Sequence, residues 1–131
     1  MAAIRLLLDT HTLLWWLFDD PKLSAAARSA IVDPQNEVLV SAASAWEIAT
    51  KHRLGRLPEA GDVPLRLPHY LHRARFAVLN ISLEHVMASG GLPGPHKDPF
   101  DRMLVAQARV EDLAVATADQ VFRDYGVAVI W

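Results

Sequence analysis

Short apolar runs alternate along the chain with segments in which hydrophobic residues recur at helical spacing. The apolar runs predict strands at residues 4–9, 37–41, 77–81, 113–117 and 127–131. The segments between them predict helices at residues 12–18, 24–33, 44–54, 68–76, 83–89, 99–111 and 119–125. Strands that are apolar throughout are buried on both faces, so the pattern predicts an α/β fold with a central parallel sheet between two helical layers.

Proline and glycine mark the predicted loops. The stretches "LPEAGDVPLRLP" at 57–68 and "GGLPGPHKDP" at 90–99 are rich in both residues and are predicted to be irregular. Pro68 suits the first turn of the helix that follows the first loop. Asp98 precedes Pro99 and is therefore disposed away from helical dihedral angles, which favours an N-cap for the helix at 99–111.

The bulk composition limits the class of protein. A chain of 131 residues, 52% of them hydrophobic, is long enough for one well-buried core, and we expect a single domain over residues 1–131. The absence of cysteine excludes disulfides, thiolate metal sites and a cysteine nucleophile. No apolar run reaches the roughly 18 residues that a membrane span requires. We therefore expect a cytoplasmic protein without a membrane partner.

Charge is distributed unevenly, although the net charge is only −2. The stretch 48–77 carries the basic residues Lys51, Arg53, Arg56, Arg66, Arg73 and Arg75 against two acidic ones. Such a run is commonly a solvated helical surface. It is also consistent with a phosphate-binding flank, for which Lys51, Arg53, Arg56, Arg73 and Arg75 are the candidates.

Four acidic residues from distant segments are predicted to meet at one edge of the sheet. Asp9 ends the first strand, and Asp119 lies two residues beyond the strand at 113–117. Glu47 and Asp101 lie near the starts of helices, at the edge where the strands end. In open parallel sheets, ligands bind outside the carboxyl ends of the strands.

Each of these acids also has an ordinary explanation. Asp9 and Asp119 could cap helices, and Glu47 could pair with Lys51 one helical turn later. Four anions at one edge, however, repel each other unless a cation binds, and oxygen ligands favour Mg²⁺ or Mn²⁺ over zinc. The corresponding chemistry is metal-assisted hydrolysis of a phosphodiester. For His11 and His96, which lie near these acids, we expect a hydrogen-bonding or core role.

The segments "LLLDTH", "SAWEIA", "DPFDRMLVAQA" and "TAD" resemble, in order and spacing, the PIN-domain ribonucleases, and in particular the toxins of VapBC-type toxin–antitoxin modules. The resemblance implies a PIN-like three-layer α/β/α fold with an acidic cleft at the carboxyl edge of the sheet. It assigns the catalytic, metal-binding positions to Asp9, Glu47, Asp101 and Asp119, with Thr117 beside them. Asp98 is an extra acid, and we expect it to shape the helix start while Asp101 binds metal.

The resemblance also implies an activity and partners. Members are Mg²⁺- or Mn²⁺-dependent endoribonucleases that cut structured RNA such as tRNA or rRNA and thereby inhibit translation. A cognate VapB-type antitoxin neutralises them, and the toxins form homodimers or toxin–antitoxin hetero-oligomers.

Three other functions are less consistent with the residues. An aspartyl-phosphate phosphatase needs a second aspartate two residues after Asp9, where this chain has His11. A receiver module needs a central phosphorylatable aspartate, which "EVLVSAAS" does not offer. A non-catalytic PIN-derived binding or regulatory module would be expected to have lost acids, whereas all four matching positions here are acidic.

Overall fold

A computed structural model describes residues 3–131, which form a five-stranded sheet covered by helices. The strands are β1 (Arg5–Leu8), β2 (Glu37–Ser41), β3 (Ala77–Leu79), β4 (Ala114–Ala116) and β5 (Val129–Ile130). Their order across the sheet is β3-β2-β1-β4-β5, and every neighbouring pair is parallel. Because β1 lies at the centre, its carboxyl end is next to the carboxyl ends of both β2 and β4.

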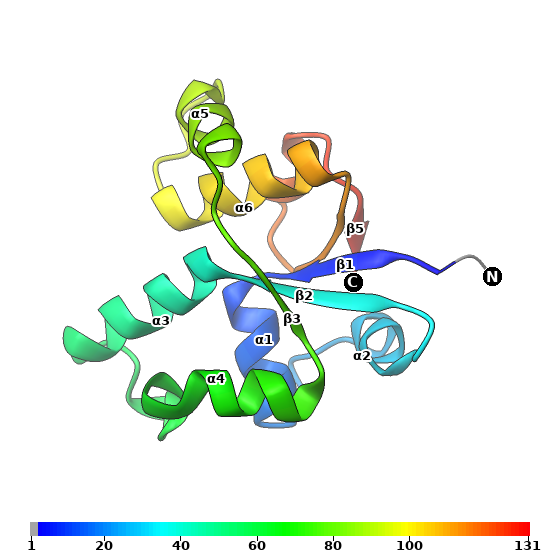
Figure 1. The fold of residues 1–131 in the computed structure, drawn as a ribbon, viewed down its shortest axis with the longest axis vertical. Coiled ribbons are helices and arrows are strands. Elements are labelled where there is room, and N and C mark those ends of the chain that lie inside the picture. The colour runs from blue at the N-terminus through cyan, green and yellow to red at the C-terminus, as the bar shows by residue number, and fades with distance from the viewer. Residues whose placement is uncertain (1–2) are drawn as a thin grey trace.

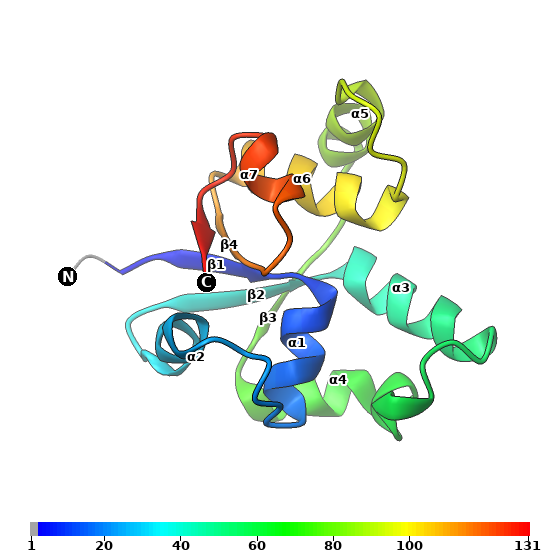
Figure 2. The same cartoon turned by 180° about the vertical axis from the view of Figure 1, so that it is seen from behind.

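Helices cover both faces of the sheet, as Figures 1 and 2 show from opposite sides. One face carries the helices α1 (Thr10–Leu17), α2 (Ala25–Val32) and α4 (Val63–Ala74). The other face carries α5 (Leu83–Gly91), α6 (Pro99–Glu111) and α7 (Val121–Asp124). The helix α3 (Ala42–Arg53) extends outward from the end of β2. The predicted three-layer α/β/α fold with a parallel sheet is confirmed.

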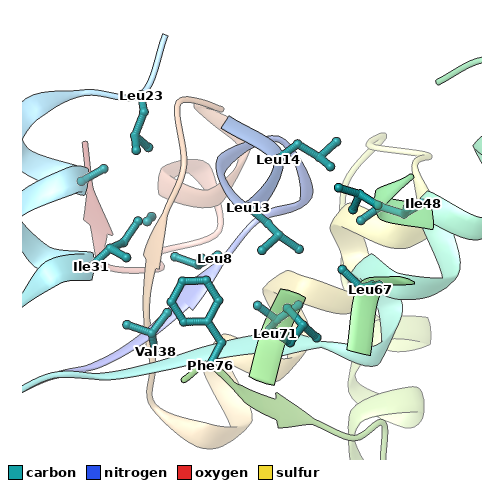
Figure 3. Packing of buried hydrophobic residues seen from close by; sticks show 14 of the residues in the cluster. Leu8, Leu13, Leu14, Leu23, Ile31, Val38, Ile48, Leu67, Leu71 and Phe76 are labelled. Atoms are coloured by element: carbon teal, nitrogen blue, oxygen red, sulfur yellow. The ribbon is translucent and has the colours of Figure 1, made fainter. Parts of the chain in front are cut away.

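Alternate residues of the central strand enter two separate cores. Leu8 of β1 packs with residues of α1, α2 and α4, and Figure 3 shows it close to Leu13 and Phe76. Leu7, the preceding residue, packs instead with Leu104 of α6 and with α7. Both leucines are fully buried. Full burial of a leucine side chain contributes roughly 1.5–3 kcal/mol, so the apolar strand stabilises both layers and fixes where its carboxyl end lies.

Several predicted boundaries were wrong, among them the start of α1, which is Thr10 and not residue 12. Two further differences have a clear local cause. The helix predicted at 44–54 begins at Ala42, because Ser41 serves as its N-cap and accepts a hydrogen bond from the backbone N–H of Ala43. The predicted loop at 57–68 contains a 3₁₀ turn at Pro58–Ala60 and the first part of α4, which begins at Val63. A proline within a helix forbids one backbone hydrogen bond and disturbs the preceding turn. Accordingly, α4 bends at Arg66, two residues before Pro68, which lies inside the helix and not in its first turn as predicted.

Across residues 3–131, we find no helix with the length and apolar character needed to cross a membrane.

Candidate active site

A pocket of about 240 Å³ opens at the carboxyl edge of the sheet, where β1 and β4 end. It gathers side chains from segments that are far apart in the sequence. Its lining consists of Asp9, Thr10, His11, Trp15, Glu47, Lys51, Asp98, Asp101, Ala118 and Asp119. The structure thus brings all four acids predicted for this edge into one pocket, together with Asp98. Thr10, His11 and Trp15 belong to α1, and of these only His11 was noted near the site from the sequence.

Asp9 is held in place by hydrogen bonds to both of its carboxylate oxygens. It is the N-cap of α1, and its Oδ1 accepts a 2.8 Å bond from the backbone N–H of Thr12. Its Oδ2 accepts a 2.5 Å bond from the Thr117 hydroxyl. The side chain is buried, yet it lines the pocket. The two interpretations of Asp9, as cap and as site residue, are therefore compatible.

Glu47 lies in the second turn of α3, one turn deeper than predicted, and is only 4% exposed. Its Oε1 accepts a 2.6 Å hydrogen bond from the Thr10 hydroxyl. Its Oε2 lies 2.5 Å from the Lys51 ammonium, which confirms the predicted pairing one turn along the helix. A buried carboxylate needs a charged or hydrogen-bonding partner, and Glu47 has both.

Asp98 and Asp101 have different local roles at the start of α6. Asp98 is the N-cap, as predicted, and its Oδ1 accepts hydrogen bonds from the backbone N–H groups of Phe100 and Asp101. Asp101 lies in the first turn, and its Oδ2 is 3.1 Å from Nε2 of His96. The hydrogen-bonding role expected for His96 is confirmed, whereas His11 is exposed and therefore has no core role.

The electrostatic environment raises the pKa of Asp101 to about 6. Burial is the largest cause, because it disfavours the charged form of a carboxyl group. The negative charges of Asp98, Asp119 and Glu47 act in the same direction, and the hydrogen bond from His96 opposes them. Burial and the neighbouring carboxylates therefore both favour the protonated form of Asp101.

Asp119 lies in the turn between β4 and α7 and is exposed. Its backbone N–H donates to the Thr117 hydroxyl over 3.0 Å, and its Oδ1 accepts from the backbone N–H of Val121. The N-cap position of α7 is occupied by Gln120, which makes no capping side-chain bond. Asp119 thus accepts a hydrogen bond from the first residue of α7, as a cap would, but it does so from the position before the N-cap.

The basic residues predicted as a flank are divided among three places. Lys51 lines the pocket. Arg53 and Arg56 are exposed at the outer end of α3. Arg73 and Arg75 are exposed where α4 ends and leads into β3, which is the opposite edge of the sheet from the pocket. Only Lys51 is therefore adjacent to the acids.

The donor set suits a hard divalent cation, because the pocket offers five carboxylates and a single ammonium group. Within residues 3–131, however, no three Asp, Glu or His side chains are already arranged around one point as a ligand set. The oxygens of Asp9 and Glu47 instead accept hydrogen bonds from protein donors. This arrangement fits Mg²⁺ or Mn²⁺ held by one or two carboxylates with water in the other positions.

Two curated relatives share sequence with this chain. Ribonuclease VapC16 of Mycobacterium tuberculosis (strain ATCC 25618 / H37Rv) is 38% identical over 69 residues, which cover 50% of this chain and only 49% of that relative. The chain thus matches about half the length of VapC16. Ribonuclease VapC22 of the same organism is 29% identical over 121 residues, which cover 91% of this chain and 90% of that relative.

Solved structures and a family model agree with the fold. VapBC2 from Rickettsia felis, bound to a DNA fragment from its promoter, contains a chain that superposes with a TM-score of 0.71 at 14% identity, covering 96% of this chain and 97% of that one. FitAcB from Neisseria gonorrhoeae gives a TM-score of 0.68 at 21% identity, with 95% of both chains covered. At these identities the likeness concerns the fold. The family model described as "PIN domain" matches residues 6–128, a span that includes all four acids, and the chain therefore belongs to the PIN-domain family.

Proposed function

We propose that this protein is a metal-dependent endoribonuclease that hydrolyses phosphodiester bonds of structured RNA. The observation that carries the proposal is the convergence of Asp9, Glu47, Asp98, Asp101 and Asp119 on one pocket at the carboxyl edge of the sheet. A structural role accounts for Asp98, but it does not account for burying Glu47 beside other anions. The ribonuclease names of both curated relatives support the same activity.

Asp9 and Asp101 are the residues that would hold Mg²⁺ or Mn²⁺ directly, with Glu47 and Asp119 acting directly or through water. When bound, the metal supplies a more acidic water and neutralises charge on the phosphoryl group. The chain's own contribution is positional. Thr12 and Thr117 fix the orientation of the Asp9 carboxylate, and Thr10 does the same for Glu47. Orientation of this kind lowers the cost of reorganisation during the reaction.

Lys51 has a separate role in this proposal. Its ammonium group partly neutralises Glu47 and lines the same pocket. In this proposal, Lys51 would contact a non-bridging oxygen of the substrate phosphate. The more distant arginines of the predicted flank contribute only to weaker attraction of the RNA backbone.

We further propose that the activity belongs to a toxin that acts in the cytoplasm on tRNA or rRNA and inhibits translation. The VapC names of the relatives and the VapBC and FitAcB names of the similar structures support this assignment. By the same likeness, the partner would be a VapB-type antitoxin, and the toxin would form a homodimer or a hetero-oligomer with it.

The test of the proposed function is cleavage of purified tRNA and rRNA with Mg²⁺ or Mn²⁺, and with a chelator as control. We expect cleavage with metal, none with chelator, and growth arrest when the protein is produced without a partner. Asp101→Asn should abolish cleavage while the protein stays folded. Asp98→Asn should keep much of the activity, because asparagine is also a good N-cap. No cleavage with either metal, together with harmless expression, would overturn the proposal.

The alternative is a non-catalytic PIN-derived binding or regulatory module. The observation that favours it is the Glu47–Lys51 pair, in which a protein cation already neutralises one of the four acids. A catalytic site predicts that Lys51→Met reduces cleavage. The alternative predicts RNA or partner binding without cleavage under any metal condition.

A further inference from the structure

One wall of the acidic pocket is aromatic. Trp15, in the second turn of α1 and one turn beyond His11, lines the pocket together with the exposed His11. The ring centroids of His11 and Trp15 are 5.9 Å apart, and those of Trp15 and Trp131 are 5.7 Å apart. Ring contacts thus connect His11 and Trp15, which line the pocket, to Trp131, which does not line it. We refer to His11, Trp15 and Trp131 as the aromatic row.

Core packing explains only part of this row. Trp15 is half-buried and packs against the core of the α1 face, so its apolar surface is partly used there. The remainder lines a pocket whose other walls are mostly charged. Tryptophan surface that faces a polar pocket contributes less to stability than tryptophan surface buried in the core. Its position at the pocket is thus better accounted for by contact with a ligand.

The other tryptophans provide a comparison within the same chain. Trp16 packs with Phe76 and with the guanidinium of Arg28. Trp46 contacts Phe100 edge-on. Neither lines the acidic pocket. Trp15 is therefore distinguished by its location and not by its residue type.

The charge of the pocket indicates what the row would bind. Five carboxylates repel a polyanion except where Lys51 or a bound cation neutralises them. Phosphates that flank the reacting one gain little binding energy in this pocket, so contacts to other groups of an RNA substrate would add to its affinity there. Bases stack on aromatic side chains with little dependence on their identity, which supplies that energy without requiring positive charge.

We propose that Trp15, supported by His11 and Trp131, is a stacking subsite for a nucleobase that flanks the phosphodiester held at the acids. The proposal rests on the proposed ribonuclease function and adds a base-binding site to it. Stacking would splay a base out of the RNA strand, so the subsite favours single-stranded loops or bulges at the cleavage position. It predicts weak preference among the bases and strong discrimination against a missing base.

The experiment compares two ligands that differ only in their bases. Tetrauridylate and an abasic ribose-phosphate tetramer, each labelled with a fluorophore, are titrated with the protein by anisotropy. Ca²⁺ replaces Mg²⁺ so that binding is measured without cleavage, and the length of each ligand is checked after the titration to verify that it is intact. We expect the full-length protein to bind tetrauridylate about 5- to 150-fold more tightly than the abasic tetramer. Trp15→Leu should bring this ratio close to one, and Trp15→Phe should retain most of it.

Trp16→Leu is the matched control, because it removes a neighbouring tryptophan of the same helix that lies outside the pocket. It should keep the wild-type ratio. Since each ratio is measured within a single protein preparation, a loss of folded protein changes both affinities equally and cancels. If Trp15→Leu does not fold, the ratio in Trp15→Phe and in the unmodified protein carries the test.

Two results would overturn the inference. A ratio near one in the unmodified protein would show that bases are not bound, even if RNA is cut normally. A ratio that persists in Trp15→Leu would assign the aromatic row to packing or to a protein partner. Neither result affects the proposed nuclease, which instead fails if the protein cuts no RNA with Mg²⁺ or Mn²⁺.

Discussion

The hydroxyl of Thr117 donates a 2.5 Å hydrogen bond to Oδ2 of Asp9, a residue 108 positions earlier in the chain. The hydroxyl oxygen of Thr117 also accepts a hydrogen bond from the backbone N–H of Asp119. One buried threonine thus joins the end of β1 to the turn after β4 and sets the spacing between two of the pocket's acids.

Thr117→Val should therefore loosen the site while preserving the shape of the side chain. The substitution leaves a buried carboxylate oxygen of Asp9 without its partner, which costs about 1–3 kcal/mol, and it also removes the acceptor of the Asp119 backbone N–H. We expect a lower free energy of unfolding in urea and weaker cleavage. Thr117→Ser, which keeps the hydroxyl, should restore most of both. Equal stability of the valine and serine variants would contradict the role of this bond.

The raised pKa of Asp101 gives a pH-dependent prediction for the metal-free protein. The folded state holds this proton up to a pH of about 6, whereas the unfolded chain releases it near 3.8. The folded state therefore binds more protons between these values, and the contribution of Asp101 to the free energy of unfolding falls as pH rises through that window. Asp101→Asn should gain stability relative to the unmodified protein between about pH 4 and pH 7.

Thermal melts in chelator across that pH range provide the measurement. Glu59→Gln, which removes an exposed acid outside the pocket, is the control and should leave the difference in Tm constant with pH. If the difference in Tm between Asp101→Asn and the unmodified protein were also constant with pH, the pKa of Asp101 would not be raised in the folded state.

Millimolar Mg²⁺ should raise the Tm of the unmodified protein. An ion that binds only the folded state adds about 2.7 kcal/mol at ~100 times its Kd. The melts must be matched in ionic strength with NaCl, because salt alone screens the repulsion among the acids. Asp9→Asn should remove most of the specific increase. A Tm that follows ionic strength irrespective of the cation would argue against a site that binds divalent ions.

Arg102 should hold the loop that leads into the site. Its guanidinium donates to the backbone carbonyls of Leu92 at 2.5 Å and of His96 at 2.9 Å, and thus spans the stretch before Asp98. We expect Arg102→Gln to increase hydrogen exchange at residues 92–98 and to reduce cleavage. Arg109→Gln, on an exposed position of the same helix, is the control and should change neither. Unchanged exchange in the loop would show that other contacts hold it.

Much of the fold could be predicted from local patterns. Apolar strand runs located all five strands, and the Asp98–Pro99 pair located the start of α6. The Glu47–Lys51 pair followed from helical spacing alone. These features depend on residues within one turn or one strand of each other, where periodicity and capping preferences act.

The features that were missed depend on tertiary contacts. The hydrogen bond between Thr10 and Glu47 joins residues 37 positions apart, and no local pattern indicates it. The start of α4 at Val63 was missed because the prolines of the stretch 57–68 predicted a loop. The helix accommodates them by bending at Arg66. The ring contact between Trp15 and Trp131 likewise exists only after the sheet has formed.

The central position of β1 has a consequence for how the protein is made. Its pairing with β4 requires residues 114–116, and Asp9 gains its bond to Thr117 only after them. A growing chain on the ribosome therefore carries Asp9 and Glu47 long before the pocket can close around them. An enzyme that is proposed to cut tRNA or rRNA would thus remain inactive during its own synthesis. It would become active only once the segment around Thr117 has emerged and folded.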